Sequence, residues 1–389
     1  MGRLWRDVSV SAAVAGFVAV LVGFTSSAAI VFAAAQALGA NAAQTASWMW
    51  ALGLGMGFTS LGLSLWYRQP VLTAWSTPGA AVLAVSQGVT LPEATGAFIV
   101  CALLIMVVGY SGVFERLMSR IPVALANALL AGVLARFALD AVGAVSTAPV
   151  LVLSMTAAFL LGRRLWPRWA VPGVLAVGMA VAAALGQLHL GSVSWVWATP
   201  VWVNPQWSLG AMVSVALPLF VVTMASQNLP GVAAQRASGY STPVSPVVGT
   251  TGLASLLLAP FGGYALNLAA ITAAICMGRE AHPDPDRRYT AAAAAGVLYI
   301  VLGLAGGTIV SLLAAFPKAL VLAVAGLALL GTIAAGLASA MKDDSHRDAA
   351  LLAFLVTLSG ITVAGVGSAF WGVVVGVVAQ AVLHARKAD

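Results

Sequence analysis

The sequence predicts an all-α polytopic membrane protein, and three observations support this prediction. First, 61% of the 389 residues are hydrophobic and only 7% are charged, which is too few to cover a surface in water. Second, long stretches such as 8–67 and 349–385 contain no charged residue. Third, these stretches are rich in Ala, Val, Leu and Gly, as membrane-spanning helices of roughly 20 residues are. A disordered, fibrous or nucleic-acid-binding chain is excluded.

Apolar stretches between charged and turn-forming residues give about fourteen transmembrane segments. We expect them near 10–36, 45–66, 71–88, 95–114, 121–140, 147–162, 170–187, 210–234, 244–260, 264–278, 289–313, 317–340, 348–364 and 367–384. With both termini in the cytoplasm, all but Arg136 and Lys318 of the 18 Lys and Arg residues fall inside. The positive-inside rule expects such a split. The tryptophan-rich connection near 186–208 then lies outside, as an interfacial loop or short surface helix.

The two halves of the chain resemble each other weakly, which predicts seven plus seven segments as inverted repeats. Ser27 with Ala34-Ala35-Gln36 has a counterpart in Ser226 with Ala233-Ala234-Gln235. Pro122-Val-Ala-Leu125 matches Pro317-Lys-Ala-Leu320, in the same order and at a similar offset. Inverted repeats are typical of secondary transporters, whose binding site lies at mid-membrane between the repeats.

The third and tenth segments are predicted to be half-helices that begin inside the membrane. Ser76-Thr77-Pro78-Gly79 reads as a helix N-cap with Pro at the first helical position. In the tenth segment, Gly262-Gly263 permits an extended entry, and Asn267 is expected to cap the helix that follows. Two helix N-termini would attract an anion. The alternative is an ordinary kink at Pro or Gly between packed helices.

The polar groups expected at mid-membrane are neutral hydroxyls and amides, which suit an anionic substrate because a carboxylate would repel it. Gln227-Asn228 beside Leu-Pro230-Gly231 is the most specific pair, since two adjacent amides are costly in lipid. Trp75, Phe24 and Tyr264 are candidates for an apolar slot around an aromatic ring. The polar candidates are Thr25, Ser26, Ser27, Ser76, Thr77, Ser226, Gln227, Asn228, Tyr264, Asn267 and Thr272.

Charged side chains and cysteines within the segments are few. Asp140 and Glu115 lie near segment ends. Arg136 is expected to form an ion pair with Asp140, four residues later on the same helix. The alternative is that Asp140 or Glu115 carries the proton. Cys101 and Cys276 fall inside apolar segments, so neither a disulfide nor a thiolate metal site is expected. No nucleophile–base cluster is evident, so we expect no enzyme, no metal and no cofactor.

Several motifs resemble the benzoate:proton symporter (BenE) family over essentially the whole chain. They are Ala74-Trp-Ser-Thr-Pro-Gly-Ala80, Ser226-Gln-Asn-Leu-Pro-Gly231, Pro260-Phe-Gly-Gly-Tyr-Ala-Leu-Asn-Leu-Ala-Ala-Ile-Thr272 and Gly278-Arg-Glu-Ala-His-Pro-Asp284. The resemblance implies import of benzoate or a similar aromatic acid with protons across the bacterial inner membrane. It also implies the fold of uracil permeases and sulfate-type anion transporters. Leu266 stands where nucleobase permeases carry a Glu, which weakens a nucleobase function.

This resemblance implies two domains and a set of binding residues. Residues 1–117 and 209–314 would form a mobile core domain, and 118–208 and 315–389 a gate domain. A nucleobase or inorganic-anion carrier, or an anion channel, remains the alternative function, and the oligomer, including a homodimer, is left open. The expected substrate-binding residues are Ser26, Ser27, Trp75, Ser76, Thr77, Gly79, Gln227, Asn228, Tyr264, Leu266 and Asn267.

Overall fold

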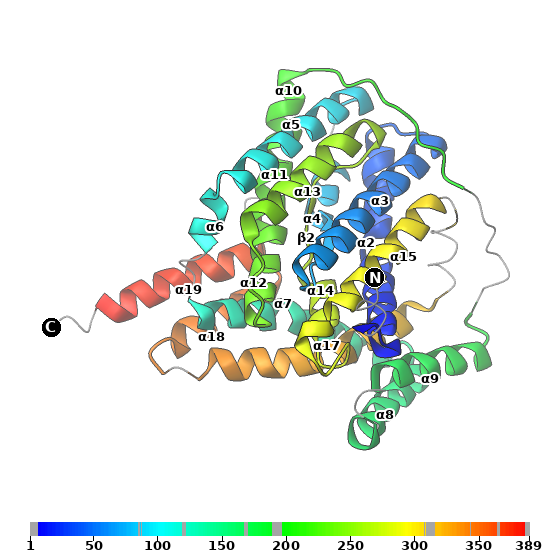
Figure 1. The fold of residues 1–389 in the computed structure, drawn as a ribbon, viewed down its shortest axis with the longest axis vertical. Helices are drawn as coiled ribbons and strands as arrows, with labels where there is room; N and C mark the ends of the chain where they lie inside the picture. The colour runs from blue at the N-terminus through cyan, green and yellow to red at the C-terminus, as the bar shows by residue number, and fades with distance from the viewer. Residues whose placement is uncertain are drawn as a thin grey trace.

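The structure is a computed structural model, and it is mostly helical (Figure 1). It describes residues 7–84, 86, 88–118, 122–166, 170–188, 197–306, 308, 316–342, 344–363 and 366–385. Its helices are α2 (Val10–Ala37), α3 (Ala42–Tyr67), α4 (Thr77–Ala84), α5 (Leu91–Tyr110), α6 (Val113–Met118), α7 (Val123–Gly143), α8 (Pro149–Leu165), α9 (Ala170–Ala184), α10 (Leu209–Ala211), α11 (Leu217–Thr223), α12 (Leu229–Ala237), α13 (Val244–Leu258), α14 (Ile271–Met277), α15 (Tyr289–Leu304), α17 (Lys318–Ala340), α18 (Arg347–Ser359) and α19 (Ser368–Ala385).

Six helices of the described residues are long and apolar enough to cross a membrane. They are Ala42–Tyr67, Leu91–Tyr110, Asn127–Ser146, Leu209–Ala237, Val244–Phe261 and Lys318–Ala340. The fourth of these is continuous because two π-helical turns, η4 (Met212–Ala216) and η5 (Met224–Asn228), join α10, α11 and α12. Pro218 and Pro230 follow these turns, and a proline removes one backbone donor from a helix. The protein is therefore a multi-pass membrane protein.

One group of helices surrounds α2 and α4. In this group α3 packs along α15, and α5 packs along α13. Glycines permit both close approaches: a Cβ added at Gly53 of α3 would lie 2.5 Å from the Cα of Gly303 in α15, and one added at Gly109 of α5 would clash with Gly249 of α13. Small residues at such contacts are the usual way in which membrane helices approach each other closely.

A second group consists of α7, α8, α9, α17, α18 and α19. Helix α17 packs along α7, α18 contacts both α7 and α19, and α8 pairs with α9. In the view of Figure 1, α17, α18, α8 and α9 lie below α3, α5, α13 and α15. A small apolar cluster inside the second group joins α7, α17 and α18; it comprises Leu125, Ala128, Ala340, Ala350 and Ala353.

Short strands depart from the all-α prediction at two places. β1 (Thr73–Trp75) pairs antiparallel with β2 (Leu266–Leu268), and β3 (Thr362–Val363) pairs with β4 (Val366–Gly367). β1 leads directly into α4, and β2 is followed by α14. Backbone that is neither helical nor paired is costly in a membrane, so two extended segments satisfy each other by pairing. An extended entry to the tenth segment was expected from the sequence, but neither its pairing with β1 nor the strands β3 and β4 were.

The expected ion pair between Arg136 and Asp140 is wrong. In the described structure the Arg136 guanidinium instead donates to the carbonyl oxygen of Ser359, 3.0 Å away, at the C-terminal end of α18. Gly360 follows with φ of 66°, and a side chain there would collide with Arg136. Helix C-termini carry unpaired carbonyls and a partial negative charge, so a cation is favoured there. Asp140 is exposed on α7.

The tryptophan-rich connection is extended where it is described. Trp197, Trp202 and Trp207 are 72%, 58% and 63% exposed, respectively, and Trp195 lies outside the described residues. The Trp202 ring packs edge-on against Phe261, and its Nε1 donates to Asn204. Exposed indoles with a polar tip suit the headgroup region of a bilayer, as the sequence indicated.

Candidate functional site

The candidate site forms where the β1–β2 pair brings the two halves of the chain together. Ala74 faces Asn267 in the register, and Trp75 faces Leu266. Two further backbone hydrogen bonds extend the pair: Ser76 donates to Ala265 at 3.1 Å, and Ala269 donates to Leu72 at 2.9 Å. The first turns of α4 and α14 follow immediately, so their positions are fixed by the same pair of strands.

Helix α4 begins with the cap that the sequence predicted at Ser76-Thr77-Pro78. The Ser76 hydroxyl accepts from the N–H of Gly79 at 3.1 Å, and it also accepts from the Thr223 hydroxyl at 2.9 Å. Because Pro78 has no N–H and Ser76 takes that of Gly79, little of the donor capacity of this helix start remains for a ligand. Ser76 and Gly79 are therefore placed as structural residues of the turn.

Helix α14 begins at Ile271, later than expected, and Asn267 does not cap it. Asn267 lies in β2, fully buried, and its Nδ2 donates to the carbonyl of Ala265 at 3.2 Å. Its Oδ1 has no hydrogen-bond partner among the described residues. The predicted cap fails because the strand pairing of Asn267 with Ala74 holds it four residues before Ile271, the first residue of α14.

A cavity, here named the central cavity, opens beside the starts of α4 and α14. Its empty space, open mouth included, is about 520 Å³. No charged residue is among those described as its lining. The lining residues are Val22, Gly23, Phe24, Ser27, Met56, Ala74, Trp75, Thr77, Gln227, Ala269, Ala270, Ile271, Thr272 and Tyr299.

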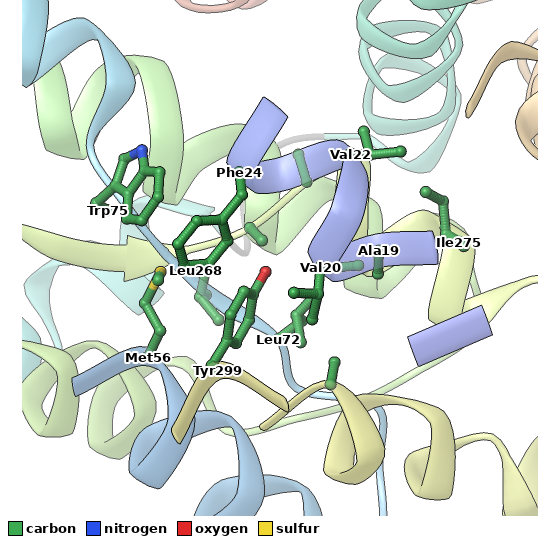
Figure 2. Packing of buried hydrophobic residues seen from close by; sticks show 14 of the residues in the cluster. Ala19, Val20, Val22, Phe24, Met56, Leu72, Trp75, Leu268, Ile275 and Tyr299 are labelled. Atoms are coloured by element: carbon green, nitrogen blue, oxygen red, sulfur yellow. The ribbon is translucent and has the colours of Figure 1, made fainter. Parts of the chain in front are cut away.

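Three aromatic rings form one wall of the central cavity (Figure 2). Phe24 and Trp75 meet edge-on with ring centroids 4.8 Å apart, and Phe24 and Tyr299 lie 5.7 Å apart. Met56 of α3 lies beside them. The Trp75 indole donates to the hydroxyl of Ser27 at 3.0 Å, which fixes the orientation of the ring. This wall can hold a flat aromatic ring by stacking and edge contacts.

Two polar side chains of the central cavity are available to a ligand. For the amide of Gln227 and the hydroxyl of Thr77, no hydrogen-bond partner is found within the described part of the chain. Both groups are hydrogen-bond donors, and a carboxylate accepts hydrogen bonds only. Ser27, by contrast, already donates to the carbonyl of Gly23 at 2.8 Å.

The structure separates Asn228 from its neighbour Gln227. The Oδ1 of Asn228 accepts the N–H of Leu268 at 2.9 Å, so this amide holds β2 in place. The π-helical turn η5 contains both residues and turns them to different environments. The sequence predicted that these amides bind the substrate or the backbone around it; Asn228 binds the backbone of β2, and Gln227 lines the central cavity.

Several predicted residues lie away from the central cavity. The ring of Tyr264 packs against Trp48 and Phe98, and its buried hydroxyl has no partner among the described residues. A Cβ added at Gly55 would lie 2.5 Å from Leu266, so this leucine fills the space beside α3. The side chains of Thr25 and Ser26 lie outside the described residues.

The two acidic candidates are also remote from this cavity. Glu115 of α6 accepts the N–H of Ser245 at 3.0 Å, in the first turn of α13. Hydrogen bonding by Ser245 lowers the pKa of Glu115, and the nearby charge of Arg236 lowers it further. Asp140 is exposed on α7, in the other group of helices.

Sequence reasoning missed two side chains of the aromatic wall, Tyr299 and Met56. Tyr299 is 1% exposed and lies in an Ala- and Gly-rich segment without charged residues. Its position is opposite Phe24 only because α15 packs along both α2 and α3. An aromatic residue in the middle of a small-residue helix was the available signal for it.

A family model and two curated proteins match most of the length of this chain. A family model described as "Benzoate membrane transport protein" (BenE) matches residues 6–382. Inner membrane protein YdcO of Escherichia coli is 50% identical over 371 residues, 95% of each chain. The benzoate membrane transport protein of Acinetobacter baylyi is 41% identical over 387 residues, 99% of this chain and 98% of its own.

A solved structure of SLC26A9 has a similar fold. It matches with a TM-score of 0.51 and 11% identity, over 99% of this chain and 66% of that longer chain. At this identity the likeness extends to the fold and no further.

Proposed function

The chain belongs to the BenE family of benzoate membrane transport proteins, and from this premise we propose that it imports benzoate, or a similar aromatic carboxylate, together with protons. Members of the family are membrane transport proteins, not enzymes. One observation carries the proposal of substrate: the central cavity has an aromatic wall together with donors at Gln227 and Thr77 that have no partner among the described residues. The ring of benzoate fits the first and its carboxylate fits the second.

Coupling to protons follows from the charge of the central cavity. None of the residues described as its lining is basic, so no described side chain of the cavity compensates the negative charge of a bound carboxylate. Moving that charge inward against a negative interior costs about 2.3 kcal/mol for every 100 mV. One proton carried with each anion removes this cost. Asp140 and Glu115 are the acidic candidates for carrying this proton.

The proposed architecture has fourteen segments, arranged as two inverted repeats of seven. Two observations support it: each of the fourteen segments expected from the sequence overlaps a helix given above, and glycine contacts join α3 with α15 and α5 with α13. In inverted repeats of seven, the second segment corresponds to the ninth and the fourth to the eleventh. The contact between α3 and α15 (second and eleventh) is therefore the counterpart of the contact between α13 and α5 (ninth and fourth). Helices α4 and α14, each preceded by a strand, then act as the two half-helices that begin at mid-membrane.

We further propose that the two groups of helices are the core domain (1–117 and 209–314) and the gate domain (118–208 and 315–389). The packing of α2, α3, α5, α13 and α15 with one another, and of α7, α17, α18 and α19 with one another, supports this division. The central cavity is lined by residues of the core group alone. By the distribution of Lys and Arg, both termini lie on the cytoplasmic side of a bacterial inner membrane. The exposed apolar faces of the helices are compatible with a homodimer.

Uptake by purified protein in liposomes tests the proposed function. Radiolabelled benzoate should accumulate above its external concentration when the interior is alkaline, and a protonophore should abolish the accumulation. Equilibration without accumulation would instead identify a channel. Uptake of uracil or sulfate in place of benzoate would identify a nucleobase or inorganic-anion carrier; the leucine at position 266, packed on Gly55, argues against the nucleobase carrier.

A further inference from the structure

A second cavity lies at the other end of α14, between the two groups of helices. We name it the inner cavity; its empty space, mouth included, is about 980 Å³. The central cavity contacts the first residues of α14, and the inner cavity contacts its last residue, Met277. At about 1.5 Å per residue the seven residues of α14 separate the two cavities by roughly 10 Å. The two cavities therefore lie at opposite ends of the same short helix.

The inner cavity is positively charged, in contrast to the central one. Three arginines and one glutamate line it, which leaves a formal excess of two positive charges. Arg288 is 9% exposed, and it donates to the carbonyls of Met277 and His282 at 2.8 Å each. Within the described chain no carboxylate lies within 4.0 Å of Arg288. The described contacts of this guanidinium are neutral carbonyls and the Tyr240 hydroxyl, so its charge still attracts an anion.

An ion pair spans the inner cavity and shows how it holds a carboxylate. The Nη1 of Arg163, in the last turn of α8, lies 2.5 Å from Oε1 of Glu280, in the loop after α14. The Glu280 side chain is 10% exposed, whereas that of Arg163 is 45% exposed and rests on the ring of Phe159. The pair lies against Gly331 of α17, where an added Cβ would be 3.0 Å from Glu280 Oε1.

We propose that the inner cavity is a second binding site for a small carboxylate, in which the carboxylate of the substrate displaces that of Glu280 from Arg163. The ligand class rests on the proposed function, and the site rests on the ion pair and the excess charge. Exchange of one carboxylate for another keeps the guanidinium of Arg163 paired throughout. The excess positive charge of the inner cavity would also attract the anion away from the central cavity, whose described lining is uncharged.

Release of Glu280 has a consequence for the contact between the two groups of helices. The pair ties α8 to the loop after α14, and a bound anion on Arg163 breaks that tie. Arrival of the substrate at the inner cavity thus frees the two groups to move relative to each other. Departure of the anion restores the pair.

Protection of a cysteine from labelling tests the site in the full-length protein. Cys101 and Cys276 are both buried, so unmodified protein serves as the blank. Ala335→Cys places an accessible thiol on the inner cavity, and Ser345→Cys, exposed beyond α17, serves as the reference thiol. Benzoate should slow the reaction of N-ethylmaleimide with Cys at 335 and leave that at 345 unchanged.

Charge variants then distinguish benzoate bound in the inner cavity from a conformational change that shields position 335 indirectly. Arg163→Gln should raise the benzoate concentration needed for protection roughly tenfold, since a hydrogen bond to a charged group is lost. Glu280→Gln should lower that concentration, because the competing carboxylate is gone. Arg164→Gln, on the same helix but not at the cavity, should change nothing. Equal protection in all three variants would overturn the proposal, as would absence of protection in the parent Ala335→Cys protein.

This assay does not depend on transport. If benzoate is taken up by liposomes but never protects position 335, the inner site is wrong and the proposed function stands. If uptake fails while protection follows Arg163 and Glu280 as described, the inner site stands and the proposed function is wrong.

Discussion

The indole Nε1 of Trp75 donates a hydrogen bond to the hydroxyl of Ser27, 3.0 Å away, and this bond joins β1 to α2. The same hydroxyl donates to the carbonyl of Gly23, so both of its hydrogen-bonding roles serve the architecture of the wall. With its indole anchored, Trp75 meets Phe24 edge-on. The aromatic wall of the central cavity is thus preorganised rather than assembled by the ligand.

Replacing Ser27 by Ala should weaken benzoate more than a small aliphatic acid. The change leaves a buried indole N–H without an acceptor, which costs about 1–3 kcal/mol and releases the ring from its position. Competition of benzoate and propionate for labelled benzoate uptake measures the two affinities. Ser154→Ala is the control, because Ser154 bonds only within its own helix α8. Equal losses for both acids would show that the wall does not hold the ring.

Gln227→Ala and Asn228→Ala should have different effects although the residues are adjacent. Loss of the Gln227 amide should weaken benzoate roughly tenfold and leave the melting temperature unchanged, because the amide lines the cavity and binds no other described residue. Loss of the Asn228 amide leaves the buried N–H of Leu268 unpaired, so thermal stability should fall. Ligand binding and thermal unfolding in detergent measure the two effects. A stable Asn228→Ala protein with lost affinity would reverse the assignment.

Gly53→Val should destabilise the contact between α3 and α15. Its new Cβ would meet the backbone of Gly303 at 2.5 Å, and overpacking of this kind costs about 1–3 kcal/mol. Gly62→Val, on the same helix, is the matched control because nothing lies within 4 Å of its added Cβ. Thermal unfolding in detergent should show a lower midpoint for the first variant alone. Equal midpoints would mean that α3 and α15 do not touch as described.

Glu115 should stabilise the fold and should not carry the coupled proton. Its pKa is lowered by hydrogen bonding from Ser245, so it contributes stability above the pKa of an unfolded Glu, and that stability is lost as the pH falls through the lower folded value. Glu115→Gln should therefore reduce thermal stability at neutral pH and flatten its decline at acid pH. Proton-driven uptake at neutral pH should persist in this variant; its loss in a well-folded protein would make Glu115 the proton carrier.

The sequence predicted the membrane character of the fold and the helix start at Ser76-Thr77, because composition and capping residues are local properties. The cap at Ser76 is one example, since a hydroxyl before Thr-Pro is set by neighbours in the chain. Contacts between the halves were not predictable in this way. Tyr264 was chosen for the aromatic wall by its nearness in sequence to Asn267, yet it packs on Trp48, while Tyr299 occupies the wall. Asn267 failed as a cap because its strand pairs with residues nearly two hundred positions earlier.

Benzoate uptake should carry no steady current. The central cavity offers no fixed charge among its described lining, so a site that moves benzoate alone would move one negative charge inward. Against a negative interior this opposes uptake by about 2.3 kcal/mol per 100 mV. A single proton taken with each anion makes the step electroneutral, and lower external pH then drives uptake directly. Liposomes on an electrode should show labelled uptake that rises as external pH falls, without sustained current, and Gln227→Ala liposomes provide the control with weakened binding. A sustained inward movement of negative charge that does not change with pH would refute proton symport and leave a benzoate uniporter or channel.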